Sequence, residues 1–206
     1  GTQKIQQQVT DLFPEVEVAR MDWDTTRGKW AFDKLIHSFA SQEVKILVGT
    51  QMVVKGLDFK NVHLVGVLNA DHLLNFPDFR AHERTYQMLS QVAGRAGRKE
   101  LRGKVLIQTY QPQHAIIQQV IDGNYEQMLE QQFKDRKEYH YPPYNRLIRI
   151  VVNHTDMETV KKASEWIVNV LLQSYSGQLL GPIFPPIARV RNRYRMQILI
   201  KIGDQQ

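Results

Sequence analysis

The first half of the chain alternates short apolar runs with longer amphipathic segments, and this alternation limits the possible folds more than any other feature. Apolar side chains recur at helical spacing in residues 3–13, 29–41 and 79–93. Strands are predicted around these helices, at residues 16–20, 44–48, 63–68 and 103–109. Strands joined by helical crossovers pair in parallel. The sequence therefore predicts an α/β fold with a parallel sheet over residues 1–111.

The pattern changes after Gln111-Pro112-Gln113, where we place a domain boundary. Helices are predicted at residues 115–121, 125–137 and 158–175, and strands at residues 146–152 and 190–202. Tyr141-Pro142-Pro143-Tyr144 stops the second of these helices, because proline cannot continue it. Residues 112–206 are therefore predicted to form a small α+β domain.

Two arginines stand three residues apart in a glycine-rich segment, residues 91–98 (QVAGRAGR). On one helical face, Arg95 and Arg98 can reach the same anionic ligand, and the glycines beside them let a polyphosphate approach the backbone. Arginine stays charged at any biological pH and stabilises charge on a phosphoryl group during its transfer. The alternative is a helix end with a glycine cap and two solvated arginines.

A second glycine-punctuated segment, residues 49–59 (GTQMVVKGLDF), follows the strand predicted at residues 44–48. Loops after the carboxyl ends of strands are the usual ligand sites of open α/β sheets. The Thr50 hydroxyl suits a phosphate group, and the Asp58 carboxylate suits a ribose hydroxyl. The alternative is an ordinary strand–helix connection in which Asp58 caps the helix.

Together, these two segments resemble motifs V and VI of superfamily 2 helicases, which lie in the second RecA-like lobe of nucleic-acid-dependent ATPases. More narrowly, six blocks in order resemble the PriA family of bacterial replication-restart helicases: residues 1–5, 20–26, 49–59, 68–71, 77–84 and 91–98. This resemblance implies a RecA-like helicase lobe 2 followed by the C-terminal domain of an ATP-dependent 3′-to-5′ DNA helicase. A looser resemblance continues through residues 141–144 and 180–182.

The resemblance also implies roles for individual residues. Arg95 and Arg98 are expected to be the catalytic pair, reaching the β and γ phosphates of ATP. Further ATP-binding residues are expected to be Gly56, Asp58, Gln91 and Gly94. DNA contacts are expected from Thr50, Gln51, Arg80, Arg84, Arg191, Arg193 and Arg195.

Four arginines alternate with other residues near the end of the chain: Arg189, Arg191, Arg193 and Arg195. In the strand predicted there, all four guanidiniums lie on one face, with Tyr194 opposite. Such a stripe suits a phosphate backbone or an acidic peptide. In the PriA family, the C-terminal domain contacts DNA and the acidic tail of single-stranded DNA-binding protein. The alternative is a solvated edge strand whose charges prevent aggregation.

The sequence lacks two parts that a helicase motor needs, a phosphate-binding Gly-x-x-x-x-Gly-Lys-Ser/Thr loop and an acidic magnesium-binding motif. Gly28-Lys29 and Gly103-Lys104 are followed by Trp30 and Val105, neither of which carries a hydroxyl. The resemblance therefore implies that ATP and Mg²⁺ are shared with a separate lobe 1. It also implies a Zn²⁺-binding cysteine-rich insertion elsewhere in the parent protein. We expect these 206 residues alone to have no detectable ATPase activity.

Two other functions fit the same motifs. The chain could be a lobe of another superfamily 2 DNA helicase, such as a RecG-like enzyme that remodels forks. It could also be a non-catalytic module that binds DNA or protein, as the missing phosphate loop suggests.

Charge and composition limit the partners. A net charge of +6 and a pI of about 9.5 favour an anionic partner. The resemblance implies branched and single-stranded DNA, single-stranded DNA-binding protein and other primosome proteins, with no membrane. Cysteine is absent and the seven histidines are scattered, so we expect no metal site and a cytoplasmic location. The resemblance implies that this location is bacterial and nucleoid-associated.

Overall fold

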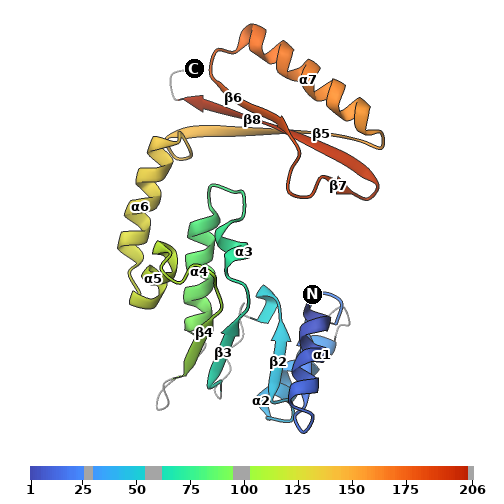
Figure 1. Cartoon of the computed structure of the whole chain (residues 1–206), viewed down its shortest axis with the longest axis vertical. Helices are drawn as coiled ribbons and strands as arrows, with labels where there is room; N and C mark the ends of the chain where they lie inside the picture. Colours follow the sequence, from blue (N-terminus) through green and yellow to red (C-terminus); the bar gives the residue numbers. More distant parts are fainter. Residues whose placement is uncertain (26–29, 54–61, 95–102, 204–206) are drawn as a thin grey trace. The chain divides into compact units, whose positions relative to one another are not determined.

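The computed structural model describes residues 1–25, 30–53, 62–94 and 103–203 (Figure 1). Four of the residues with predicted roles lie outside these ranges: Gly56, Asp58, Arg95 and Arg98. The described elements are α1 (Thr2–Leu12), β1 (Val18–Met21), α2 (Ala31–Ala40), β2 (Ile46–Gly49), η1 (Gln51–Val53), β3 (Leu64–Val67), α3 (Asp71–Leu74), α4 (Ala81–Ala93), β4 (Lys104–Ile107), α5 (Ala115–Asp122), α6 (Tyr125–Glu138), β5 (Asn145–His154), α7 (Met157–Ser174), β6 (Gln178–Ile183), β7 (Arg189–Val190) and β8 (Arg193–Gly203).

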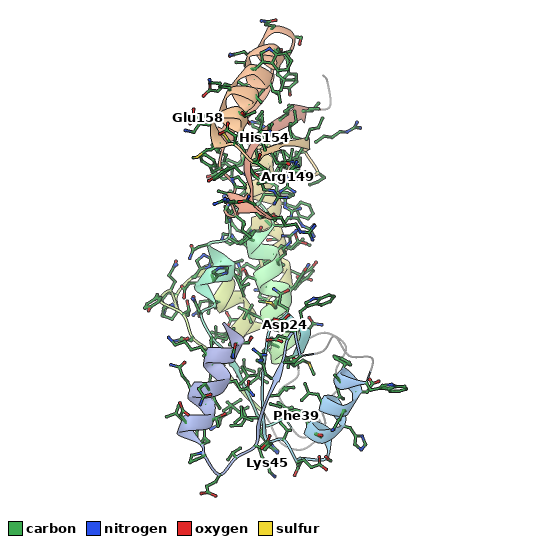
Figure 2. All side chains as sticks on the ribbon, turned by 90° about the vertical axis from the view of Figure 1, so that its right-hand side faces the viewer. Asp24, Phe39, Lys45, Arg149, His154 and Glu158 are labelled. Atoms are coloured by element: carbon green, nitrogen blue, oxygen red, sulfur yellow. The ribbon has the colours of Figure 1, made fainter. Side chains whose placement is uncertain are left out.

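The first strand pair is parallel, as the alternation of strands and helices predicts. β1 pairs with β2 in a register that joins Val18 to Ile46 and Met21 to Gly49. Val18 and Met21 are buried, and both α1 and α2 pack against β1. Figure 2 labels Asp24, which follows the end of β1, and Lys45, which precedes the start of β2. Because the two strands are parallel, these residues lie at opposite ends of the pair.

A second parallel pair joins β3 to β4, with Leu64 opposite Lys104 and Val67 opposite Ile107. The prediction of parallel strands linked by helices is confirmed by both pairs. The sequence led us to expect a single sheet, whereas the strands described here pair two and two.

Helix α4 follows its amphipathic pattern closely. Its buried side chains are Ala81, Thr85, Tyr86, Leu89 and Val92, spaced so that they share one face. Helix α5 buries Ile116, Ile117 and Val120 in the same unit. The α5 ends are well defined, since the His114 ring accepts a hydrogen bond from the Ile116 N–H and the left-handed Gly123 closes the last turn.

The C-terminal sheet is antiparallel and has the order β5-β8-β6, with β7 also paired to β8. Met196, Ile198 and Ile200 alternate along β8 and are buried. They face Val160 and Ser164 of α7, which lies along one face of the sheet (Figure 1). Asp156 caps α7, because its carboxylate accepts hydrogen bonds from the N–H and the hydroxyl of Thr159. The alternate residues of the strand, Arg195, Gln197 and Leu199, lie on the opposite face.

The single strand predicted at residues 190–202 is wrong at its beginning. Arg191 and Asn192 adopt left-handed backbone conformations, with φ of 48° and 61°, and make a two-residue turn between β7 and β8. Positive φ at both central residues is typical of type I′ hairpin turns, in which asparagine is common. The arginine-rich segment is therefore a hairpin.

The chain divides into two compact units. The first holds Gly1–Asn75 and His82–Asn124, and the second holds Phe76–Ala81 together with the chain from Tyr125 onward. The first unit thus extends past the boundary predicted at residue 111, and a short segment from the first half belongs to the second unit.

Candidate functional site

The predicted nucleic-acid contacts Thr50 and Gln51 lie at the carboxyl edge of the β1–β2 pair. Both are exposed, and they follow Gly49, the last residue of β2. A Cβ atom on Gly49 would lie 2.6 Å from the Met21 carbonyl oxygen and 2.1 Å from a Val53 methyl group. Since the backbone cannot yield at that distance, only glycine fits at this position. The Val53 N–H donates to the Thr50 carbonyl oxygen, and the Thr50 residue is exposed.

Asp22 organises the neighbouring loop after β1. Its carboxylate accepts hydrogen bonds from the Thr2 hydroxyl at 2.7 Å and from the Thr25 N–H at 3.1 Å, and it pairs with the Arg20 guanidinium at 3.3 Å. The Thr2 hydrogen bond is the main cause that lowers the pKa of Asp22. An aspartate held in this way is a charged group that organises the loop. Through its hydrogen bond with Thr2, Asp22 connects the start of α1 to the carboxyl edge of the β1–β2 pair, where Thr50 also lies.

A buried aspartate also fixes the carboxyl edge of the β3–β4 pair. Asp71 accepts hydrogen bonds from the Thr109 hydroxyl and from the Tyr110 N–H, both at 3.0 Å. The Tyr110 hydrogen bond is the main cause that lowers the pKa of Asp71. Beside it, the Ala70 N–H donates to the Gln108 carbonyl oxygen. Asp71 belongs to the family block at residues 68–71, but it was assigned no role. Its position directly after a predicted strand could have indicated that it organises the edge of the sheet.

Helix α4 carries three residues with predicted roles, and all three are exposed: Arg84, Gln91 and Gly94 at its end. Because Tyr86, Leu89 and Val92 occupy the buried face, Arg84 and Gln91 share the opposite stripe. The Gly94 N–H closes the last turn on the Ser90 carbonyl oxygen. The chain runs from Gly94 directly into Arg95, so the predicted catalytic pair follows the carboxyl end of this helix in sequence.

Arg80 is exposed and belongs to the segment Phe76–Ala81 of the second unit. Its N–H donates to the Asp78 carboxylate at 2.8 Å, which tightens the turn before α4. Arg80 and Arg84 were each predicted to contact DNA, and they belong to different compact units.

The hairpin of β7 and β8 brings three predicted DNA contacts together. Arg191, Arg193 and Arg195 line a hollow of about 330 Å³ with Asn153 and Val190. The Arg193 guanidinium donates to the Asn153 side-chain oxygen at 2.9 Å. Three guanidiniums around one hollow repel one another, so an anionic ligand there would relieve an unfavourable interaction.

The fourth arginine does not join this group. Arg189 pairs with Tyr194 across the hairpin, and cross-strand partners share a face. Its guanidinium lies 4.8 Å from the centre of the Tyr194 ring and donates to the Asn192 side-chain oxygen. The prediction of four arginines on one face with Tyr194 opposite is therefore wrong for Arg189. Arg191, Arg193 and Arg195 form one cluster, and Arg189 lies with Tyr194 on the other face.

Neither a metal-binding cluster nor a membrane-spanning helix occurs among the described residues. Over the described ranges, no three histidine, aspartate or glutamate side chains lie close enough to hold a metal ion. None of the helices in those ranges has the length and apolar character to cross a membrane.

Comparison with protein families assigns both halves of the chain. Residues 2–100 match the helicase conserved C-terminal domain, and residues 137–206 match the primosomal protein N C-terminal domain. The two matches occur in the order that the sequence predicts.

Curated relatives match almost the whole chain. The replication restart protein PriA of Bacillus subtilis is 45% identical over 207 residues, which cover 100% of this chain and 26% of the relative. The Synechocystis protein of the same name is 44% identical over 98% of this chain and 24% of the relative. The Treponema pallidum protein is 37% identical over 98% of this chain and 31% of the relative. The chain thus spans about a quarter to a third of the length of these relatives, and it belongs to the family of PriA replication restart proteins.

Proposed function

We propose that this chain forms the second motor lobe and the C-terminal domain of an ATP-dependent 3′-to-5′ DNA helicase. The complete protein would remodel stalled or abandoned replication forks and restart replication as part of a primosome. The observation that carries the proposal is the edge at Gly49, where neighbouring atoms leave no room for a Cβ atom and the following residues, Thr50 and Gln51, are exposed after a parallel strand. Family membership over nearly the whole chain supports the same function.

In this proposal, ATP binds between this lobe and a separate lobe 1, and its hydrolysis supplies the free energy for movement along DNA. Arg95 and Arg98 bind the β and γ phosphates and stabilise the charge that develops there. Gly56 and Asp58 contact the nucleotide, while Gln91 and Gly94 complete the segment after α4. Gln91 and Gly94 are exposed, as this division of tasks requires. Magnesium would be shared with lobe 1, and Zn²⁺ would be held by a cysteine-rich insertion of the complete protein.

The DNA contacts fall into two groups. Thr50, Gln51 and Arg84 belong to the first unit, where hydroxyl, amide and guanidinium groups suit a phosphate backbone. Arg80 and the hollow of Arg191, Arg193 and Arg195 belong to the second unit. The hollow suits branched or single-stranded DNA, or the acidic tail of single-stranded DNA-binding protein, because each presents anionic groups to guanidiniums.

The test is the ATPase activity of the complete protein on forked DNA. Arg98→Ala should lower kcat by about 10³-fold or more, the order expected for an arginine finger. Arg98→Lys keeps the charge and loses the two-pronged geometry, so it should also be strongly impaired. DNA binding without ATP should stay unchanged in both variants. Retained ATPase or unwinding in Arg98→Ala would refute the assignment, as would strong ATPase activity of the 206-residue chain alone.

A second function has one specific observation in its favour. The arginine hollow is complete within the second unit and requires no nucleotide, so this part could act as a binding module for DNA or protein. If Arg193→Ala abolishes DNA binding while the complete protein shows no ATPase activity, the binding module is the better description.

A further inference from the structure

Four side chains of the second unit form one stack. The Phe79 and Tyr141 rings lie 5.1 Å apart and nearly parallel, at an angle of 9°. The Arg136 guanidinium lies 5.3 Å from the centre of the Phe79 ring, and the Lys201 ammonium lies 4.0 Å from the centre of the Tyr141 ring. Each ring therefore contacts the other ring and one cation, and both kinds of contact are favourable.

Lys201 shows how firmly this stack is built into the sheet. The residue is only 6% exposed, and its ammonium donates to the Tyr139 carbonyl oxygen at 2.6 Å. Burial lowers the pKa of Lys201. A buried ammonium is costly unless it is paired, so the carbonyl oxygen and the Tyr141 ring must offset the loss of water. The contact between β8 and residues 139–141 is thus an integral part of the unit.

The segment on the other side of the stack is fixed as well. The Tyr141 N–H donates to the Arg136 carbonyl oxygen at 2.7 Å, and the Arg136 guanidinium donates to the Pro142 carbonyl oxygen at 3.4 Å. The end of α6 and the chain after it therefore hold the Tyr141 ring in place. Phe79 is the member of the stack that comes from the first half of the chain, ahead of α4.

Phe79 stands directly before α4, which begins at Ala81. The chain contributes Phe76–Ala81 to the second unit and returns to the first unit at His82, within the same helix. The opposite end of α4 is Ala93, followed by Gly94 and Arg95. A helix transmits displacement along its axis because its backbone hydrogen bonds make it stiff.

We propose that Phe79 is a positioning residue that fastens the first turn of α4 to the C-terminal unit, so that DNA binding by that unit acts through α4 on the rate of ATP hydrolysis. The fastening depends on the stack alone. The coupling rests in addition on the proposed motor function. Two experiments separate these claims.

The first experiment tests the fastening on the 206-residue chain, without nucleotide or DNA. Trypsin cleaves after Arg80, which is exposed but held next to Phe79. In Phe79→Ala, cleavage at this bond, measured by mass spectrometry, should become about tenfold faster or more, because the segment opens more often. Phe76→Ala is the matched control, since Phe76 lies in the same segment and is 46% exposed.

A second variant, Phe79→Leu, distinguishes the loss of the ring contacts from general unfolding. Phe79→Leu keeps an apolar side chain but removes the ring that both Arg136 and Tyr141 contact. Faster cleavage after Arg80 in both Phe79 variants, with an unchanged melting temperature of the C-terminal unit, supports the fastening. Equal cleavage rates in wild type, Phe79→Leu and Phe76→Ala would overturn it.

The second experiment tests the coupling in the complete protein. In Phe79→Leu, the stimulation of ATPase activity by forked DNA should fall by about tenfold, while kcat without DNA and the affinity for DNA stay within about twofold. A residue needed only for stability would lower the ATPase rate with DNA and the ATPase rate without DNA by the same factor. That outcome would overturn the coupling. If the wild-type protein shows no DNA-stimulated ATPase activity, the proposed function and the coupling both fail, whereas the trypsin result still decides the fastening.

Discussion

The turn at Arg191 combines backbone strain with a predicted binding role, and this combination gives a sharp prediction. Arg191 has a φ of 48°, where the Cβ atom of an ordinary L-residue crowds the following carbonyl oxygen. This conformation costs about 1 kcal/mol for residues other than glycine and asparagine. Arg191→Asn should remove most of this cost, whereas Arg191→Ala should keep it, because alanine has a Cβ atom and no compensating side-chain hydrogen bond. The asparagine variant is thus expected to be about 0.5–1 kcal/mol more stable than the alanine variant.

The expected difference is measurable by thermal unfolding. A change of 1 kcal/mol shifts the melting temperature by about 4–8 °C in a domain of 60–100 residues. The chain has two compact units, so the transition of the C-terminal unit must be followed separately. Tyrosine signals in the near-ultraviolet circular dichroism spectrum report mainly on this unit, since six of the eight tyrosines belong to it.

Binding should change in the same way in both variants. Each loses one of the three guanidiniums of the hollow, so the slope of log affinity against log salt should decrease by about 0.7 for a single-stranded oligonucleotide. Fluorescence anisotropy with a labelled oligonucleotide measures this slope. Arg146→Ala is the control, because Arg146 is an exposed arginine of β5 that does not line the hollow. An asparagine variant that melts no higher than the alanine variant would refute the strain argument, and an unchanged salt slope would refute the phosphate contact.

Two further predictions concern the residues that hold each unit together. Gly181→Ala should destabilise the C-terminal unit by about 1–3 kcal/mol, because φ is 103° and the new Cβ atom would lie 2.7 Å from the Gln197 carbonyl oxygen. Gly66→Ala, with no atom near the new Cβ, should cost far less in the same urea titration, and equal losses would contradict the argument. Asp71 has a lowered pKa in the folded chain, so its charged form contributes stability above the ordinary pKa of 3.8, and this contribution disappears as the pH falls through the lowered value. The stability difference between wild type and Asp71→Asn, measured in urea at several pH values, should therefore be constant near neutral pH and shrink in acid; a difference that does not shrink would rule out this role.

Local patterns in the sequence predicted most of the helices and several strands. The helix predicted at residues 158–175 is α7 (Met157–Ser174), because its apolar stripe is regular and Asp156 supplies the cap. The parallel pairing of β1 with β2 also followed from the order of the elements. These features depend on periodicity and on short-range contacts, which a single sequence contains.

Features that depend on distant contacts were missed. Strand β6 was not predicted, because Gly181 and Pro182 interrupt the apolar pattern and its pairing partner is β8. The β7–β8 turn was hidden by the alternation of the arginines, although Asn192 is a common residue of such turns. The position of Phe79 in the C-terminal unit depends on Tyr141 and Arg136, which no local pattern connects to it.

The site was predicted in part. Thr50 and Gln51 are exposed after a parallel strand, as expected, and three of the four alternating arginines share one hollow. The roles of these residues remain predictions. Arg95, Arg98, Gly56 and Asp58 lie outside the described residues, so their predicted contacts with ATP rest on the family alone and are tested by the Arg98 variants.

The central place of β8 in the C-terminal sheet has a consequence for synthesis on the ribosome. β5, β6 and β7 are each paired with β8, which follows all three in the sequence. During translation, these three strands and α7 emerge with no partner strand available, so this sheet can assemble only after β8 has left the exit tunnel. Until then, the apolar side chains of β5 and β6 stay exposed on unpaired edges, and the nascent chain is most vulnerable to aggregation.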